Sequence, residues 1–219
     1  MLFSVALTLG FSSCSMVASK VDPSKFPEPT RSQIIKLQKD QVVVRKQYTQ
    51  GSAKMAEAYS TIARACGEEE LSAKLKAQAS AIRQASSSDA EAKKQVSRGK
   101  SLEKDVQSTL ANSNASTVKS KKLFAQGLRE KDAAYMTLLK LSASAADKAF
   151  TATKLIKKAS PMEKVMLTAS FDPIIHVAKD VPATLRNEKK FNENLKAKGK
   201  QYSFPVPKGN LATPKMFKF

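Results

Sequence analysis

Apolar side chains recur at alternating steps of three and four residues along this chain, and this spacing constrains the fold more than any other feature. Such spacing puts the apolar positions on one face of a long helix, as in a coiled-coil seam. Between residues 30 and 65 they are Ile34, Leu37, Val44, Tyr48, Met55, Ala58 and Ile62. Pro29 and Thr30 are suited to start a helix, and Gly67 is suited to cap its end. We predict one helix over residues 30–65.

Two further stripes follow the first. One spans residues 68–110 and consists of Leu71, Leu75, Gln78, Ile82, Ala85, Ala92, Val96, Val106 and Leu110. Its weakest part is "QASSSDAEA" (84–92), where we expect a bend or a break. The other spans residues 117–158 and consists of Val118, Leu128, Tyr135, Leu138, Ser142, Ala149 and Ile156. "ANSNAS" (111–116) separates the two as a turn. No short strands recur at regular spacing, which excludes a β fold.

A fourth helical region starts at a capping box formed by Ser160, Pro161 and Glu163. Pro173 and Pro182 are expected to break it, because an internal proline removes one backbone hydrogen bond. The predicted fold is therefore all-α. It is an elongated antiparallel bundle of three long coiled-coil-like helices with a proline-broken fourth, over residues 30–199. Because its alanine-rich seams bury little area, we expect a homodimer to add stability.

The charge is strongly basic, with 38 Lys and Arg against 19 Asp and Glu and a net charge of +19. Residues 115–219 hold 21 of the basic side chains but only eight of the acidic ones. Such a field attracts anionic lipid headgroups, anionic wall polymers, acidic proteins or nucleic acid. Nucleic acid ranks lowest, because no recognition motif accompanies the charge. The alternative is a solvated lysine-rich face that only keeps the protein soluble.

Residues 200–219 form an extended, proline-containing tail in which lysines alternate with aromatic residues. We predict that an anionic surface binds the lysines of this tail and of the residues just before it: Lys196, Lys198, Lys200, Lys208, Lys215 and Lys218. Aromatic residues beside lysines are typical of a bilayer interface. The alternative is that the aromatic residues pack back on the bundle while the lysines face water.

The N-terminal segment, residues 1–14, is apolar and ends in "FSSC". It resembles the lipobox of bacterial lipoprotein precursors, although Phe11 stands where leucine is usual and no basic residue precedes the apolar run. The resemblance implies lipidation at Cys14 and attachment to a membrane. The proline-containing residues 15–29 would then be a tether. An ordinary signal cut near Ala18, or a retained apolar arm, are the alternatives.

The candidates for chemistry are few. His176 is the single histidine, with Asp172 and Asp180 four residues to either side, and we interpret it as structural. No metal site, cofactor or catalytic group is expected from this pattern. Cys66 precedes Gly67 at a helix end, and we predict a small buried thiol there.

We therefore expect a non-enzymatic cell-envelope lipoprotein, anchored in the membrane and either periplasmic or surface-exposed. Its basic rod would act as a spacer or as a binding module for an anionic surface. The alternative is a cytoplasmic, peripheral membrane protein that resembles, in outline only, the membrane-curving BAR dimers. The third hypothesis is nucleic-acid binding.

Overall fold

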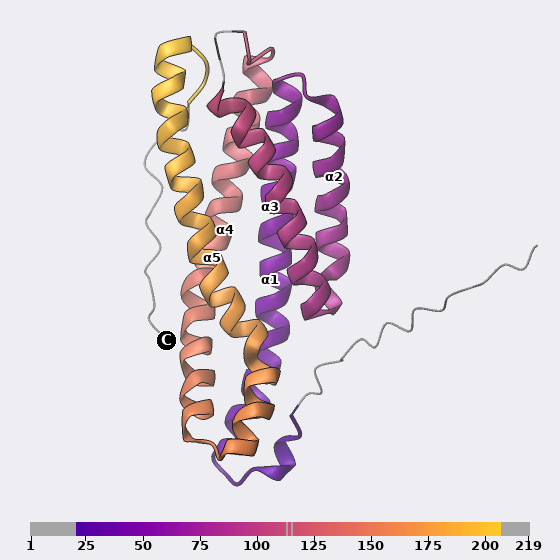
Figure 1. The fold of residues 1–219 in the computed structure, drawn as a ribbon, viewed down its shortest axis with the longest axis vertical. Helices are drawn as coiled ribbons and strands as arrows, with labels where there is room; N and C mark the ends of the chain where they lie inside the picture. The colour runs from indigo at the N-terminus through magenta and orange to yellow at the C-terminus, as the bar shows by residue number, and fades with distance from the viewer. Residues whose placement is uncertain (1–20, 113, 115, 207–219) are drawn as a thin grey trace, which may run out of the picture.

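The computed structural model describes residues 21–112, 114 and 116–206, and these contain no strand. Within them lie five α-helices: α1 (Thr30–Ala65), α2 (Glu69–Gln84), α3 (Asp89–Ala111), α4 (Lys121–Lys158) and α5 (Pro161–Tyr202). Figure 1 shows α1, α3 and α5 running in one direction and α2 and α4 in the other. The predicted all-α, elongated antiparallel bundle is confirmed.

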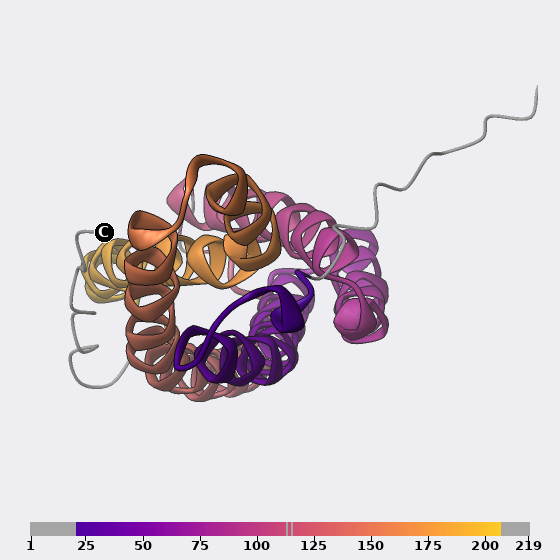
Figure 2. The ribbon, with the colours of Figure 1, turned by 90° about the horizontal axis from the view of Figure 1, so that it is seen from below.

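Different helix termini form the two ends of the bundle. At the entry end α1 begins, α4 ends and α5 begins; at the far end α1 ends, α4 begins and α5 ends (Figure 1). With 36 and 42 residues, α1 and α5 are about 54 and 63 Å long at 1.5 Å per residue. Figure 2, seen from the entry end, shows α2 on the outside of the bundle. Among the described elements, α2 contacts only α1, α3 and the short helix η2 (Ala85–Ser87).

Helix α1 has the predicted bounds, and its end is fixed by a Schellman motif. Gly67 has a φ of +80°, a backbone conformation that glycine adopts without strain. The Gly67 amide donates to the Arg64 carbonyl oxygen at 3.0 Å, and the Glu68 amide donates to the Ala63 carbonyl oxygen at 3.0 Å. These bonds satisfy carbonyl groups that the helix end leaves without partners.

The second stripe forms two helices rather than one. It breaks within the predicted weak stretch, where η2 ends and the Ser88 hydroxyl accepts a hydrogen bond from the Glu91 amide at 3.4 Å. Serine is suited to this N-cap position because its hydroxyl replaces a missing backbone acceptor. The chain therefore reverses between α2 and α3, and the outline of three long helices that suggested BAR domains is replaced by a five-helix body.

The predicted break in the fourth helix is wrong. α5 is continuous from Pro161 to Tyr202, with Pro173 and Pro182 inside it. Each proline removes one amide donor, but buried side chains continue on both sides of the prolines and hold the helix against the bundle. They include Phe171, Ile174, Val177, Val181, Leu185 and Phe191. Tertiary packing thus outweighs the local cost of the prolines.

The described parts of the two flanking segments pack on the body, which differs from the predicted tether (15–29) and tail (200–219). Val21 and Phe26 are buried, and Gln38 Nε2 donates to the Val21 carbonyl oxygen at 2.8 Å. After α5, Phe204 is buried with its ring centroid 5.5 Å from that of Phe124. The aromatic side chain at the start of the tail therefore packs back on the bundle.

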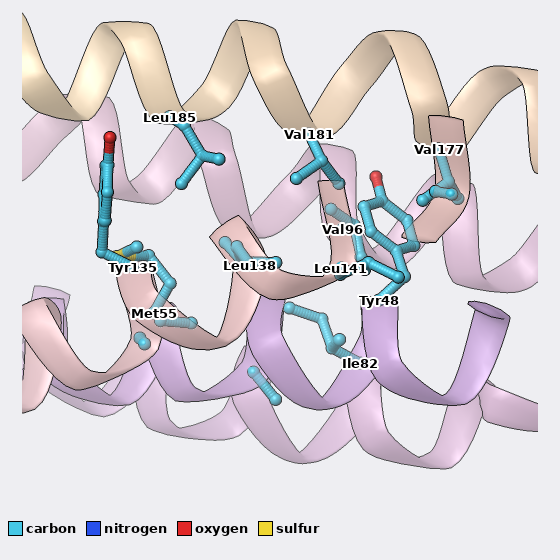
Figure 3. Packing of buried hydrophobic residues seen from close by; sticks show 14 of the residues in the cluster. Tyr48, Met55, Ile82, Val96, Tyr135, Leu138, Leu141, Val177, Val181 and Leu185 are labelled. Atoms are coloured by element: carbon cyan, nitrogen blue, oxygen red, sulfur yellow. The ribbon is translucent and has the colours of Figure 1, made fainter. Parts of the chain in front are cut away.

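The predicted apolar faces form one core between the helices. Every position of the first stripe from Ile34 to Ile62 named above is buried, and the other two stripes are buried or half-buried throughout. Figure 3 shows how α1, α2, α3, α4 and α5 contribute side chains to this core: Tyr48, Met55, Ile82, Val96, Tyr135, Leu138, Leu141, Val177, Val181 and Leu185.

Candidate functional site

Three of the predicted lysines of the C-terminal region, Lys196, Lys198 and Lys200, lie near the end of α5, at the far end of the bundle. Lys198 and Lys200 occupy the last turns of α5, and Lys198 Nζ lies 5.8 Å from the centroid of the Tyr202 ring. Lys196 is half-buried and its charge lies near Asp132 on α4. Three predicted residues, Lys208, Lys215 and Lys218, lie outside the described residues.

The structure adds two lysines that sequence reasoning missed. Since Phe124 contacts Phe204, the start of α4 lies beside the end of α5, and Lys121 and Lys122 are exposed there. We name Lys121, Lys122, Lys196, Lys198 and Lys200 the far-end cluster. The signal in the sequence was the "SKKL" at a helix start, where lysines are unfavourable for the helix dipole.

The entry end carries the other basic surface. A groove of about 570 Å³ lies between α1 and α4, and four lysines line it: Lys36, Lys148, Lys154 and Lys158. Asp40 and Asp147 also line the groove, so the cations exceed the anions. Phe150 stands at the groove with 60% of its surface exposed. The groove is therefore amphipathic, with cations around an apolar side chain.

A buried polar layer lies inside the bundle, nearer its far end than its entry end, and sequence reasoning missed it entirely. Lys131 on α4 is fully buried, and its Nζ lies 3.4 Å from Oε2 of the buried Glu188 on α5. Lys131 also donates to Asn192 Oδ1. A buried ion pair of this kind is stable only when further hydrogen bonds satisfy its remaining polar atoms.

Tyr59 and Gln107 supply those bonds from the opposite helices. The Tyr59 hydroxyl on α1 donates to Glu188 Oε2 at 2.8 Å. Gln107 on α3 donates from Nε2 to Glu188 Oε1 at 3.0 Å and to the Tyr59 hydroxyl oxygen at 2.6 Å. Four helices thus meet at one carboxylate, which fixes their register.

Glu103 on α3 is the second carboxyl group of this layer and is 5% exposed. Burial, followed by the charge of Glu188, raises its pKa to about 8, against the opposing effect of Lys100 and Lys131. Glu103 therefore keeps its proton at neutral pH, and the layer holds one ion pair beside a neutral acid. Its groups are sealed from solvent, which suits a structural role better than a chemical one.

His176, which we interpreted as structural, is half-buried on α5. Its ring packs edge-to-face against Tyr48, with the centroids 6.4 Å apart, and burial lowers its pKa. Asp180 accepts a hydrogen bond from the Tyr48 hydroxyl at 2.7 Å and pairs with Lys100. Burial raises the pKa of Asp180, but Lys100 and Tyr48 outweigh it and hold that pKa below its usual range. Among the described residues, no three His, Cys, Asp or Glu gather to hold a metal.

Of the two cysteines, Cys66 lies among the described residues and Cys14 does not. Cys66 is buried as predicted, and burial raises the pKa of its thiol to about 11. Cys14, the predicted lipidation site, lies outside the described residues. No helix in the described part of the chain is long and apolar enough to cross a membrane.

The site is thus defined by charge and position rather than by a catalytic constellation. Comparison with known proteins gives no further guide, because no family model, curated protein or solved structure matches this chain.

Proposed function

We propose that this chain is a non-enzymatic cell-envelope lipoprotein that holds a basic binding surface away from its membrane. In this proposal Cys14 carries the lipid, the helical bundle is the spacer, and the far-end cluster binds an anionic wall polymer or an acidic partner. The net charge of +19 supports an anionic partner.

One observation carries the proposal: Val21, the first described residue, packs near one end of the body, and the far-end cluster lies at the other. Val21 is held on α1 at the entry end, while Lys198 and Lys200 end α5. The 42 residues of α5 separate these ends by about 63 Å. A lipid at Cys14 would therefore leave the far-end cluster well outside the headgroup layer.

The anchor is tested by expressing the full chain in a lipoprotein-processing bacterium and separating membranes at high salt. The Cys14→Ala variant is expected to leave the membrane fraction, while Cys66→Ala stays in it and serves as the matched control. Wild-type protein should also have the intact mass of a chain cut before Cys14 and acylated. Two acyl signals give stable attachment where one gives only marginal binding. If the Cys14→Ala variant remains wholly with the membranes, the anchor is wrong.

The binding surface is tested with poly(glycerol phosphate) on the full chain. Glutamine at four far-end lysines should weaken binding more than glutamine at four exposed lysines on the other helices. The first set is Lys121, Lys122, Lys198 and Lys200, and the control set is Lys46, Lys54, Lys76 and Lys104. Both variants have the same net charge, so only position differs. Equal losses would mean that the far end is not the binding surface.

A further inference from the structure

Exposed apolar side chains are concentrated at the entry end. The described residues expose seven large hydrophobic side chains, and six lie on the first half of α1, the last third of α4 or the first turns of α5: Ile35, Val42, Val43, Phe150, Met162 and Val165. Met162 is 78% exposed and Val165 is 72% exposed. Scattered apolar residues on a surface need no explanation, but a concentration at one end indicates an interaction site.

The same end is rich in cations. The groove lysines Lys36, Lys148, Lys154 and Lys158 lie between α1 and α4, and Lys157 and Lys164 are exposed beside them. In the described part of the chain, none of the six ion pairs includes any of these lysines. The cations are therefore available to an external anion.

An anionic bilayer matches this combination better than a polymer does. Apolar side chains gain free energy by leaving water for the acyl boundary, while lysines gain from the negative surface potential of the headgroups. A soluble acidic polymer uses only the second contribution and gives no reason for Met162 and Val165 to be exposed.

The position of the entry end agrees with this partner, and here the argument rests on the proposed anchor. Val21, which is held on α1, lies seven positions after Cys14 in the sequence. At about 3.5 Å per residue, Val21 cannot lie more than about 25 Å from a lipid at Cys14, which keeps the adjoining entry end near the membrane. We therefore propose that the bundle meets an anionic membrane end-on. Phe150, Met162 and Val165 insert at the interface, and the groove lysines bind the lipid phosphates.

The test uses tryptophan as a position-specific probe, because the sequence contains none. Val165→Trp and Met162→Trp place the probe at the entry end, and Met136→Trp places it on an equally apolar exposed position of α4 away from that end. All three are made in the full chain with Cys14→Ala, so that lipidation plays no part. Circular dichroism confirms that each variant keeps its helix content.

With vesicles of phosphatidylglycerol and phosphatidylcholine, we expect the emission of the two entry-end probes to shift to the blue and to resist acrylamide quenching. Met136→Trp should show neither change, and pure phosphatidylcholine should produce neither change in any variant. Equal shifts at Met136 and Val165, or equal shifts with neutral vesicles, would overturn end-on electrostatic docking.

A charge-matched pair tests the groove. Glutamine at Lys36, Lys148, Lys154 and Lys158 should weaken vesicle binding about tenfold or more, because each cation near an anionic surface adds to binding. Glutamine at Lys46, Lys54, Lys76 and Lys104 should weaken it much less. Similar losses in the two variants would overturn the groove as the headgroup site.

A second copy of the chain is the competing occupant of the apolar end. If Val165→Ser abolished a concentration-dependent dimer and left vesicle binding unchanged, the membrane proposal would be wrong. Because every variant lacks Cys14, a negative result here leaves the proposed anchor and far-end binding intact. If the proposed lipid anchor is wrong, these vesicle measurements still test binding at the entry end, because they do not depend on lipidation.

Discussion

At the scale of single residues, the burial of Glu103 should make the free energy of unfolding depend on pH. Its folded pKa of about 8 lies above the ordinary glutamate pKa of 4.5, so the folded state binds this proton more tightly than the unfolded state. Its contribution to stability is complete below about pH 4.5 and is lost as the pH rises through about 8. The charged form must then sit in the core near Glu188.

We predict that Glu103→Gln removes this dependence, because glutamine keeps the shape of the protonated acid without titrating. Between about pH 6 and pH 9 the wild type should lose about 1–3 kcal/mol of unfolding free energy more than the variant does. Urea denaturation at the two pH values measures the difference, and comparison with wild type cancels the other titrating groups. Parallel pH profiles for the two proteins would contradict a buried, protonated Glu103.

The buried polar layer was only partly predictable from the sequence. Lys131 lies three residues after Leu128 and four before Tyr135, which is a seam position. Glu188 lies likewise between Leu185 and Phe191. A charged residue at a seam position of a predicted apolar face was the available signal for Lys131; no apolar face had been predicted around Glu188. Their partnership was not predictable, because it depends on which helices become neighbours and in what register.

At the scale of helices, two glycines lie where one helix contacts another. Substitution by alanine is expected to change the stability differently at the two positions. A Cβ on Gly127 of α4 would lie 2.6 Å from Ile62 Cγ1 and 3.1 Å from the Ile62 backbone nitrogen. A Cβ on Gly99 of α3 would lie 3.0 Å from Ile82 Cδ1, the end of a flexible side chain. The first contact involves backbone, so only separation of α1 from α4 relieves it.

We predict that Gly127→Ala destabilises the protein by about 1–3 kcal/mol through overpacking. Gly99→Ala should be neutral or stabilising by up to about 1 kcal/mol, because alanine favours the helix and Ile82 can adjust. Urea midpoints at unchanged m values measure both. A Gly127→Ala protein as stable as wild type would show that α1 and α4 do not approach as closely as described.

Helix positions were more predictable than helix continuity. The bounds of α1 followed from apolar spacing, a start at Thr30 and a glycine after its end. The break between α2 and α3 was expected within a serine-rich stretch, but the reversal was not, because local sequence does not show whether a break bends a helix or turns it back. Pro173 and Pro182 led to the wrong prediction of a break, because packing of the flanking turns of α5 outweighs the local preference of proline.

At the scale of the molecule, charge acts in two opposing ways. A net charge of +19 attracts anionic surfaces, but it also makes the folded body repel itself. Among the described residues six ion pairs offset this repulsion, and the buried Lys131–Glu188 pair is shielded from salt. Salt should therefore affect mainly the unpaired surface lysines.

We predict that added NaCl raises the melting temperature while it weakens binding to acidic polymers and vesicles. From about 0.01 to 0.15 M the Debye length falls from about 30 to about 8 Å, so repulsion between surface charges is screened first. A variant with glutamine at six exposed lysines should show a smaller rise; they are Lys39, Lys46, Lys54, Lys76, Lys93 and Lys104. Calorimetry and vesicle co-sedimentation over one salt series measure both responses. A melting temperature that falls with salt would mean that the surface charges stabilise the fold, and that a binding partner is not needed to explain them.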